Sequence, residues 1–152
     1  MNTLPFPSQP PVFCLVPVDD IIELRRNVLR KEIPHLSPEF PEDRLPDTVH
    51  FAAMSEGLAI ACLTLFPSTW AGKEAFQLRG MAVDPVWQGK HLGAKLLEFA
   101  KTKMMSRSLV RLWWCNARES AVPFYEKQGW KIASEPFVVQ SIGNHYKMMI
   151  QY

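Results

Sequence analysis

A short stretch near the middle of the chain has the pattern of an anion-binding loop: Gln88, Gly89, Lys90, His91, Leu92, Gly93 and Ala94. It follows an apolar-rich run that breaks at Asp84-Pro85, and it leads into apolar residues at helical spacing. Backbone N–H groups in a first helical turn lack intrahelical partners, and the helix dipole favours negative charge there. Glycine lets a phosphate approach the backbone closely. The pattern predicts a phosphate cradle, and a turn that serves only geometry is the alternative.

The spacing differs from that of two well-known phosphate loops. No Gly-Lys-Ser/Thr follows, which excludes a Walker-type loop, and the preceding run is not the first strand of a βαβ series, which argues against a dinucleotide fingerprint. A second segment, residues 116–130, begins with Asn116 after an expected strand, carries Phe124 and Tyr125 in a helix, and stops at Gly129. Taken alone, it also suits a helix that packs Phe124 in the core and leaves Tyr125 half-buried.

Size and charge limit the classes of protein that this chain can form. With 152 residues, 47% of them hydrophobic, the chain suits one domain over residues 1–152. A net charge of +2 gives little reason to expect nucleic-acid binding. The sequence has no run of about 18 apolar residues, so a membrane-spanning helix is not expected. The N-terminus lacks the pattern of a secretory signal. Three cysteines in apolar runs fit reduced thiols in a cytoplasmic protein better than disulfides or a metal site.

Hydrophobic periodicity predicts an α/β fold that positions these segments. We expect strands at residues 12–17, 48–54, 58–66, 73–83, 109–115, 130–133 and 145–151. Helices are expected from a cap at Asp19 or Asp20 to about Lys31, and at residues 93–107 and 120–128. Short turns make an antiparallel meander of residues 48–83, whereas the strand–helix–strand unit over residues 76–115 should place two strands in parallel. The last two strands should pair antiparallel, giving a mixed, largely antiparallel sheet with helices on both faces.

Residues 32–47 are predicted to form a long loop. Prolines at positions 34, 38, 41 and 46 exclude a long regular element and leave room for at most one helical turn, at residues 41–44. Loops of this length in a compact domain are often functional. We therefore interpret this segment as a candidate lid on the substrate side.

Together, the two chemical segments resemble the GNAT N-acetyltransferases. The family's loop reads Gln/Arg-x-x-Gly-x-Gly/Ala after a strand, and its later segment reads Asn-x-x-Ala/Ser-x-x-Phe/Leu-Tyr-x-x-x-Gly-Phe/Trp. The first pattern maps to Gln88, Gly93 and their neighbours, and the second maps to Asn116, Ala121, Phe124 or Tyr125, Gly129 and Trp130. The order of the expected elements also matches, so the resemblance covers nearly the whole chain.

One departure from the family pattern is His91, which stands where the first glycine of the Gly-x-Gly pair is usual. A non-glycine residue with positive φ costs on the order of 1 kcal/mol. We therefore expect a reshaped pyrophosphate contact rather than loss of binding. The His91 imidazole is itself a candidate hydrogen-bond donor to a phosphate oxygen.

The resemblance implies transfer of an acetyl group from acetyl-CoA to a primary amine by direct attack in a ternary complex. It places the pyrophosphate on the loop and the pantetheine arm along the strand that ends at residue 83, where the parallel neighbour splays away. The implied cofactor-binding residues are Met81, Ala82, Val83, Gln88, Gly89, Lys90, His91, Gly93, Ala94 and Asn116. Tyr125 matches the acid that protonates the departing thiolate, and a backbone N–H near Val83 matches the oxyanion donor. No metal is implied.

The general base stays open. Where histone-type relatives carry a glutamate, this chain has Gln77, and an amide cannot act as a base. The candidates are Glu74, His50, Glu119, His145 and a water chain that ends in bulk solvent.

The acceptor stays open as well, as a small-molecule or peptide amine. Acidic residues of the long loop either attract a cationic amine or form a solvated surface: Glu39, Glu42, Asp43 and Asp47. A catalytically inactive CoA-binding or interaction module on the same fold is the alternative function. Homodimers are common in the family, so a homodimer through the final strands is a further possibility.

Overall fold

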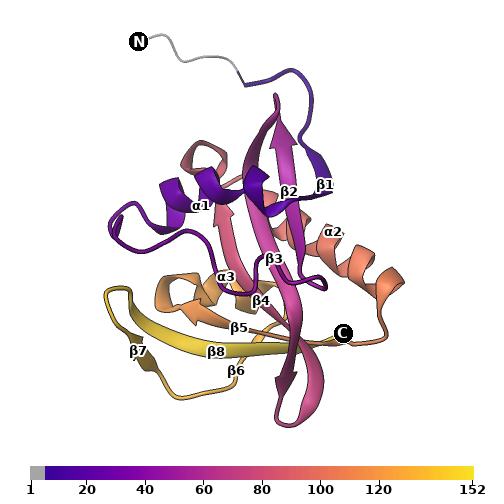
Figure 1. Ribbon diagram of the computed structural model, residues 1–152, viewed down its shortest axis with the longest axis vertical. Coiled ribbons are helices and arrows are strands. Elements are labelled where there is room, and N and C mark those ends of the chain that lie inside the picture. The colour runs from indigo at the N-terminus through magenta and orange to yellow at the C-terminus, as the bar shows by residue number, and fades with distance from the viewer. Residues whose placement is uncertain (1–5) are drawn as a thin grey trace.

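Within residues 6–152, the part of the chain that the computed structural model describes, eight strands form one mixed sheet (Figure 1). The strands are β1 (Val12–Val16), β2 (Val49–Ser55), β3 (Leu58–Trp70), β4 (Lys73–Val83), β5 (Leu112–Arg118), β6 (Lys131–Ile132), β7 (Phe137–Val139) and β8 (Gly143–Gln151). Their order is β1-β2-β3-β4-β5-β8-β6, with β7 also paired to β8. The β4–β5 pair is parallel, and the other pairs are antiparallel, which confirms the predicted mixed sheet.

The helices cover both faces of the sheet, as the sequence predicts. They are α1 (Ile22–Leu29), α2 (Leu92–Arg107) and α3 (Val122–Lys127), with short 3-10 turns η1 (Val18–Asp20), η2 (Pro85–Trp87) and η3 (Glu119–Ala121). Figure 1 shows α1 crossing the sheet. Alternation along the strands explains the two layers, since Ala52 and Cys62 pack with Leu24 of α1, whereas Phe51 and Leu63 pack in the larger core with α2 and α3.

The parallel strands β4 and β5 separate after a short paired stretch. Their register covers only Phe76, Gln77 and Leu78, opposite Trp113, Trp114 and Cys115. Beyond these residues, β4 continues to Val83 and β5 to Arg118 without pairing with each other. The result is an open edge on β4 beside the start of α2.

A β-bulge accompanies this separation. The β3–β4 register shifts between the pairs Cys62–Ala82 and Thr64–Arg79, so β4 carries one extra residue there. Gly80 lies in the bulge with φ +68°, and a Cβ at this position would lie 2.8 Å from Phe40 Cε2 and 2.9 Å from Arg25 Nε. Glycine is therefore required by both the backbone conformation and the close contact.

Several predicted boundaries differ from the structure. Strand β3 continues to Trp70, which pairs with Lys73, so the turn lies at Ala71-Gly72. The strand after α2 starts at Leu112 rather than at residue 109, and the segment between the last two predicted strands contains the short strand β7. None of the described side chains caps α1, which instead continues from the 3-10 turn η1.

The long segment between α1 and β2 consists of turns without a regular helix or strand, as its prolines predict. Cys62 and Cys115 are buried, Cys14 is half-buried, and all three are free thiols. Among residues 6–152, no helix is long and apolar enough to cross a membrane.

Candidate active site

The predicted anion-binding loop leads directly into the N-terminus of α2. The carboxylate of Asp84 accepts a hydrogen bond from the Val86 N–H at 2.9 Å, which fixes the turn η2. Gly89 and His91 follow with φ of +77° and +60°, so His91 adopts the left-handed conformation expected where the family has glycine. No described side chain caps α2, whose first-turn N–H groups therefore remain available to an anion.

A cavity of about 690 Å³, called here the loop cavity, lies at this helix end. Its walls combine the end of β4, the loop, the start of α2, and the segment from Arg118 into α3. The structure brings most of the predicted site residues together in these walls, namely Met81, Ala82, Val83, Gln88, Gly89, His91, Gly93, Ala94 and Tyr125. An open strand edge and a helix N-terminus thus face one space.

Two predicted cofactor residues lie outside the loop cavity. The Lys90 ammonium lies 4.3 Å from the centre of the Phe6 ring, on the exposed side of the loop. Asn116 lies within β5 rather than after it, and its Oδ1 accepts a hydrogen bond from Lys147 Nζ at 3.2 Å. The wrong strand boundary explains the different position of Asn116.

Two contacts hold the loop against β4. Gln88 Nε2 donates to the Val83 carbonyl at 3.0 Å. A Cβ at Gly93 would lie 3.4 Å from side-chain atoms of Met81, Val83 and Phe124, so glycine lets the start of α2 approach the strand. These contacts place the helix N-terminus beside the open edge of the strand.

A second cavity, of about 350 Å³, adjoins the first; we call it the arginine cavity after Arg30, Arg79 and Arg118 in its walls. The two cavities share five wall residues, which are Leu29, Met81, Arg118, Ala121 and Tyr125. Tyr125 therefore lies where the two spaces meet.

The Tyr125 side chain is 5% exposed, and it packs against the rings of Phe124 and Trp130. Burial raises the pKa of the Tyr125 phenol well above its ordinary value, and the nearby Cys115 thiol raises it further. Burial also raises the pKa of Cys115 to about 12. Both groups therefore stay protonated near neutral pH, and each keeps a proton that it can donate.

The structure separates the candidate bases. His145 is buried in the wall of the arginine cavity, and its Nδ1 lies 2.8 Å from the Gly143 carbonyl. Because a carbonyl only accepts, Nδ1 carries a proton and the neutral ring has its lone pair on Nε2. Glu74 and Glu119 are exposed and line neither cavity.

His50, the remaining histidine candidate, belongs to a different part of the molecule. Its Nε2 donates to the Asp43 carbonyl at 2.9 Å, and its Nδ1 lies 2.7 Å from Thr64 Oγ1. Burial lowers the pKa of His50, and it borders a separate cavity of about 370 Å³. These contacts place it away from both the loop cavity and the arginine cavity.

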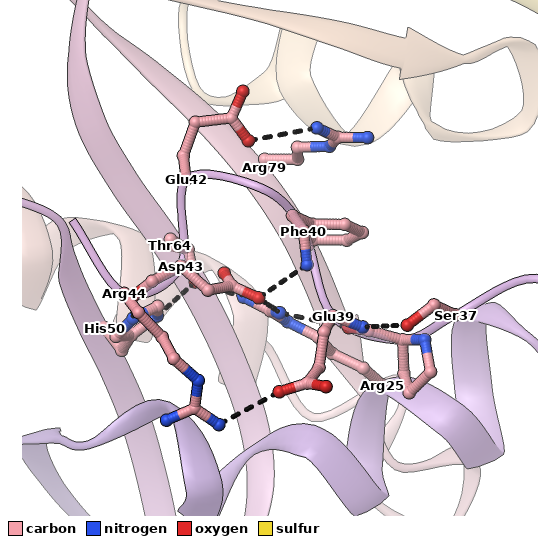
Figure 2. Close-up of polar contacts among 12 residues, drawn as sticks. Arg25, Ser37, Glu39, Phe40, Glu42, Asp43, Arg44, His50, Thr64 and Arg79 are labelled. Atoms are coloured by element: carbon pink, nitrogen blue, oxygen red, sulfur yellow. Dashed lines mark hydrogen bonds and ion pairs between the residues drawn. The ribbon is translucent and has the colours of Figure 1, made fainter.

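Three of the four acidic residues considered for the long loop, Glu39, Glu42 and Asp43, are held in ion pairs (Figure 2). Asp43 binds Arg25 through both carboxylate oxygens, at 2.7 and 3.0 Å, and this pair is buried. Glu39 pairs with Arg44 at 3.0 Å, on the exposed side. The carboxylates of Glu39, Glu42 and Asp43 therefore already have cationic partners within the chain.

The arginines of the second cavity, Arg30, Arg79 and Arg118, were not among the residues predicted for the site. Arg30 directly follows α1, Arg79 lies in β4 and Arg118 ends β5, so no local spacing connects them. An arginine directly after the Asn-Ala pair of the second motif was the one available signal.

Comparison with known proteins agrees with this geometry. The family model described as an acetyltransferase (GNAT) domain matches residues 46–132. A curated relative, the uncharacterized N-acetyltransferase YitI of Bacillus subtilis (strain 168), is 33% identical over 139 residues, covering 88% of this chain and 91% of the relative.

Solved structures share the fold at low sequence identity. An acyl-CoA N-acyltransferase from Pseudomonas aeruginosa superposes with TM-score 0.78 at 17% identity, covering 91% of this chain and 98% of the other. An aminoglycoside 6'-N-acetyltransferase complexed with coenzyme A gives TM-score 0.69 at 13% identity, covering 92% and 96%. The family model matches more than half of this chain, and the curated relative is more than 30% identical to it. The chain therefore belongs to the GNAT acetyltransferases.

Proposed function

We propose that this protein is an acetyl-CoA-dependent N-acetyltransferase that acts on a primary amine in a ternary complex. The observation that carries the proposal is the meeting of two cavities at one buried, protonated tyrosine, Tyr125. The loop cavity suits the donor and the arginine cavity suits the acceptor. Membership of the GNAT family supports this division.

The donor side matches a phosphate-bearing thioester. Pyrophosphate would accept hydrogen bonds from the first-turn N–H groups of α2, and Arg118 and Lys127 in the cavity wall add positive charge. The pantetheine arm would lie along Met81, Ala82 and Val83, where β4 has lost its strand partner. The coenzyme A complex of the aminoglycoside acetyltransferase with this fold supports the same assignment.

The acceptor side supplies a base and an acid for the two proton transfers. His145 Nε2 takes a proton from the acceptor ammonium, and the neutral amine attacks the thioester carbonyl. The C–N bond forms, the attacking nitrogen loses its second proton to solvent, and the C–S bond breaks, while the Tyr125 hydroxyl protonates the departing thiolate and later recovers a proton from solvent. His145 is the one candidate base in the wall of the arginine cavity, which favours it over Glu74, His50 and Glu119.

Donor binding is tested by calorimetric titration of acetyl-CoA into the parent protein and into Gly93→Asp. We expect binding in the parent and its loss in the variant, since the new carboxylate would lie at the start of α2, where the pyrophosphate is proposed to bind, and would crowd Met81, Val83 and Phe124. Gly72→Asp adds the same charge in the distant β3–β4 turn, where a Cβ meets nothing within 4 Å, and should bind normally. A parent protein that binds no acetyl-CoA would contradict the proposal.

Catalysis is tested by release of CoA from acetyl-CoA over a broad panel of amines. Tyr125→Phe should lower kcat about 100-fold with little change in the KM for acetyl-CoA, since general acid catalysis typically contributes that much. His145→Gln should lower the rate near neutral pH and recover toward high pH, where the acceptor amine is already deprotonated. Tight CoA binding with no turnover of any amine would instead favour the inactive module.

A further inference from the structure

The arginine cavity concentrates positive charge. Arg30, Arg79 and Arg118 reach its wall from three different elements, and no Asp or Glu of the described chain lines it. Arg30 is only 8% exposed, although it carries a permanent charge. A buried guanidinium normally has an anionic partner, so the pairing of each arginine shows whether this charge is compensated.

Two of the three arginines have only backbone carbonyls as partners in the described chain. Arg30 Nε donates to the Ser37 carbonyl at 3.0 Å, and its Nη1 to the Leu29 carbonyl at 3.4 Å. Arg118 Nη2 donates to the same Leu29 carbonyl at 3.0 Å. Neither arginine forms an ion pair within residues 6–152. The C-terminus of α1 thus gathers two guanidinium groups with only its dipole to offset them.

The third arginine is compensated weakly. Arg79 reaches Glu42 at 3.4 Å, and both side chains are partly exposed. Its guanidinium also lies 4.1 Å from the centre of the Phe40 ring, which Arg25 approaches at 4.3 Å and Arg30 at 5.7 Å. One aromatic ring therefore holds several cations near one another, as Figure 2 shows for Arg25, Arg79 and Phe40.

These arginines also repel one another. Burial lowers the pKa of Arg30, and the positive charges of Arg118, Arg79 and Arg25 lower it further. Burial also lowers the pKa of Arg118. An anion that enters the cavity would relieve this repulsion and would meet planar donors suited to carboxylate or phosphate oxygens.

We propose that the arginine cavity binds an anionic group of the acceptor, so that the substrate class is small amines bearing a carboxylate or a phosphate. This inference rests on the proposed function, because it takes the same cavity as the acceptor site. Tyr125 and His145 line the cavity that holds the arginines, so an acceptor anchored there by its anion keeps its amine near the reacting groups. A cavity of about 350 Å³ also fits a small molecule.

The first test compares matched acceptors in the CoA-release assay. The panel pairs an amino acid with its amide and an aminoalkyl phosphate with its amino alcohol. A diamine and an aminoglycoside are added as cationic acceptors. We expect kcat/KM at least tenfold higher for an anionic acceptor than for its neutral partner. The better of the carboxylate and phosphate arms identifies the natural anion. Equal or faster turnover of the neutral and cationic amines would overturn the inference while leaving the acetyltransferase intact.

Variants on the same helix test the cause of this preference. Arg30→Gln should raise the KM for anionic acceptors about tenfold more than the KM for neutral amines, whereas Arg30→Lys should keep part of the preference. Arg26→Gln is the matched control, because Arg26 is exposed and pairs with Glu23 at 2.6 Å outside the cavity. Thermal unfolding checks that all three variants are folded. An unchanged preference in Arg30→Gln would contradict the inference.

A binding measurement separates this inference from the proposed function. Inorganic phosphate and an N-acetylated amino acid are titrated by calorimetry into the parent and into Arg30→Gln. Binding to the parent that is lost in the variant supports the anion site, even if no amine is ever acetylated. If neither probe binds the parent, the anion site is wrong, even if acetylation of other amines is found.

Discussion

Two arginines at one end of the molecule show opposite uses of buried charge. Arg25, within α1, is fully buried and paired with Asp43, and it also donates to Thr64 Oγ1 at 2.6 Å. Arg30, at the end of the same helix, is nearly as buried but has no carboxylate partner in residues 6–152. A compensated charge serves the fold, whereas an uncompensated one beside a cavity is available to a ligand.

The compensated region, which consists of Arg25, Asp43 and the loop around them, fixes the long loop that the sequence suggested as a lid. Asp43 Oδ2 binds Arg25 and also accepts from the Phe40 N–H at 2.7 Å. Arg25 Nη1 donates to the Pro38 carbonyl at 3.1 Å. Figure 2 shows how these contacts converge on Arg25 beneath the loop. The loop is therefore fastened at its middle, and it holds the Phe40 ring against the neighbouring arginines.

The largest expected effect comes from breaking the compensated pair. Asp43→Asn keeps the shape but leaves the Arg25 charge buried without a counter-charge, which typically costs about 3–5 kcal/mol. Urea unfolding should show this loss in the free energy of unfolding. Asp19→Asn is the control, since Asp19 pairs with Arg44 on the surface at 2.9 Å, and it should leave the unfolding midpoint nearly unchanged. Equal effects of the two substitutions would contradict the distinction.

The uncompensated region, which is the arginine cavity around Arg30, should respond to loss of its charge with little change in stability. Arg30→Gln removes a charge that has no ionic partner, so the free energy of unfolding should change by no more than about 1 kcal/mol. In the parent, phosphate should raise that free energy by about 2.7 kcal/mol when its concentration is 100 times its dissociation constant. Chloride at matched ionic strength is the reference. Arg30→Gln should lose the part of this gain that comes from the arginine cavity, and an equal response in both proteins would refute the anion site.

Glu42 lies between the two regions and should give a smaller effect. Glu42→Gln releases Arg79 from its 3.4 Å ion pair and adds uncompensated charge beside the cavity. We expect the KM for anionic acceptors to fall by about two- to threefold, the scale of a surface ion pair. Glu39→Gln instead removes one of the two carboxylates that pair with Arg44, which lines neither cavity of the site, and should leave this KM unchanged.

The smallest effect concerns pH and the compensated region. Because Thr64 Oγ1 already accepts from Arg25, its hydroxyl proton points to His50 Nδ1, so the neutral ring fits this network. The pKa of His50 is lowered in the folded state, mainly by burial. Its contribution to stability is therefore complete above its unfolded pKa of about 6.5, and it is lost as pH falls toward the folded value.

Urea unfolding between about pH 7.5 and 5 measures this contribution. The parent should lose more free energy of unfolding over this range than His50→Gln, whose amide can still donate to the Asp43 carbonyl. The other titrating groups are common to both proteins and cancel in the difference. Identical pH dependence in the two proteins would show that protonation of His50 does not contribute to the pH dependence of stability.

Much of the fold could be predicted because local patterns determine it. Alternating apolar residues identified β2, β3 and β4, and the helical spacing after His91 identified α2. The start of β5 was wrong because a strand begins where its partner does, and Leu112 is the first residue opposite β8. Leu109 is 92% exposed although it belongs to an apolar run, so composition alone misplaced it.

The two cavities also differ in how far they could be predicted from the sequence. The loop cavity follows one continuous segment from β4 into α2, so motif and spacing placed most of its residues. The arginine cavity draws on α1, β4, β5 and the segment around β7 and β8, which meet only in the folded chain. The Arg25–Asp43 pair spans 18 residues across an irregular loop, and no periodicity connects them.

Gly80 touches both regions without a side chain of its own. A methyl group there would collide with Phe40 at 2.8 Å and with Arg25 at 2.9 Å, and its φ of +68° disfavours any other residue. Every single substitution at this position would disturb the ring that gathers the arginines and the ion pair that fastens the loop. Mutational tolerance should therefore be lowest where there is no side chain to lose, so a search for altered acceptor specificity should keep position 80 fixed and vary the walls around it.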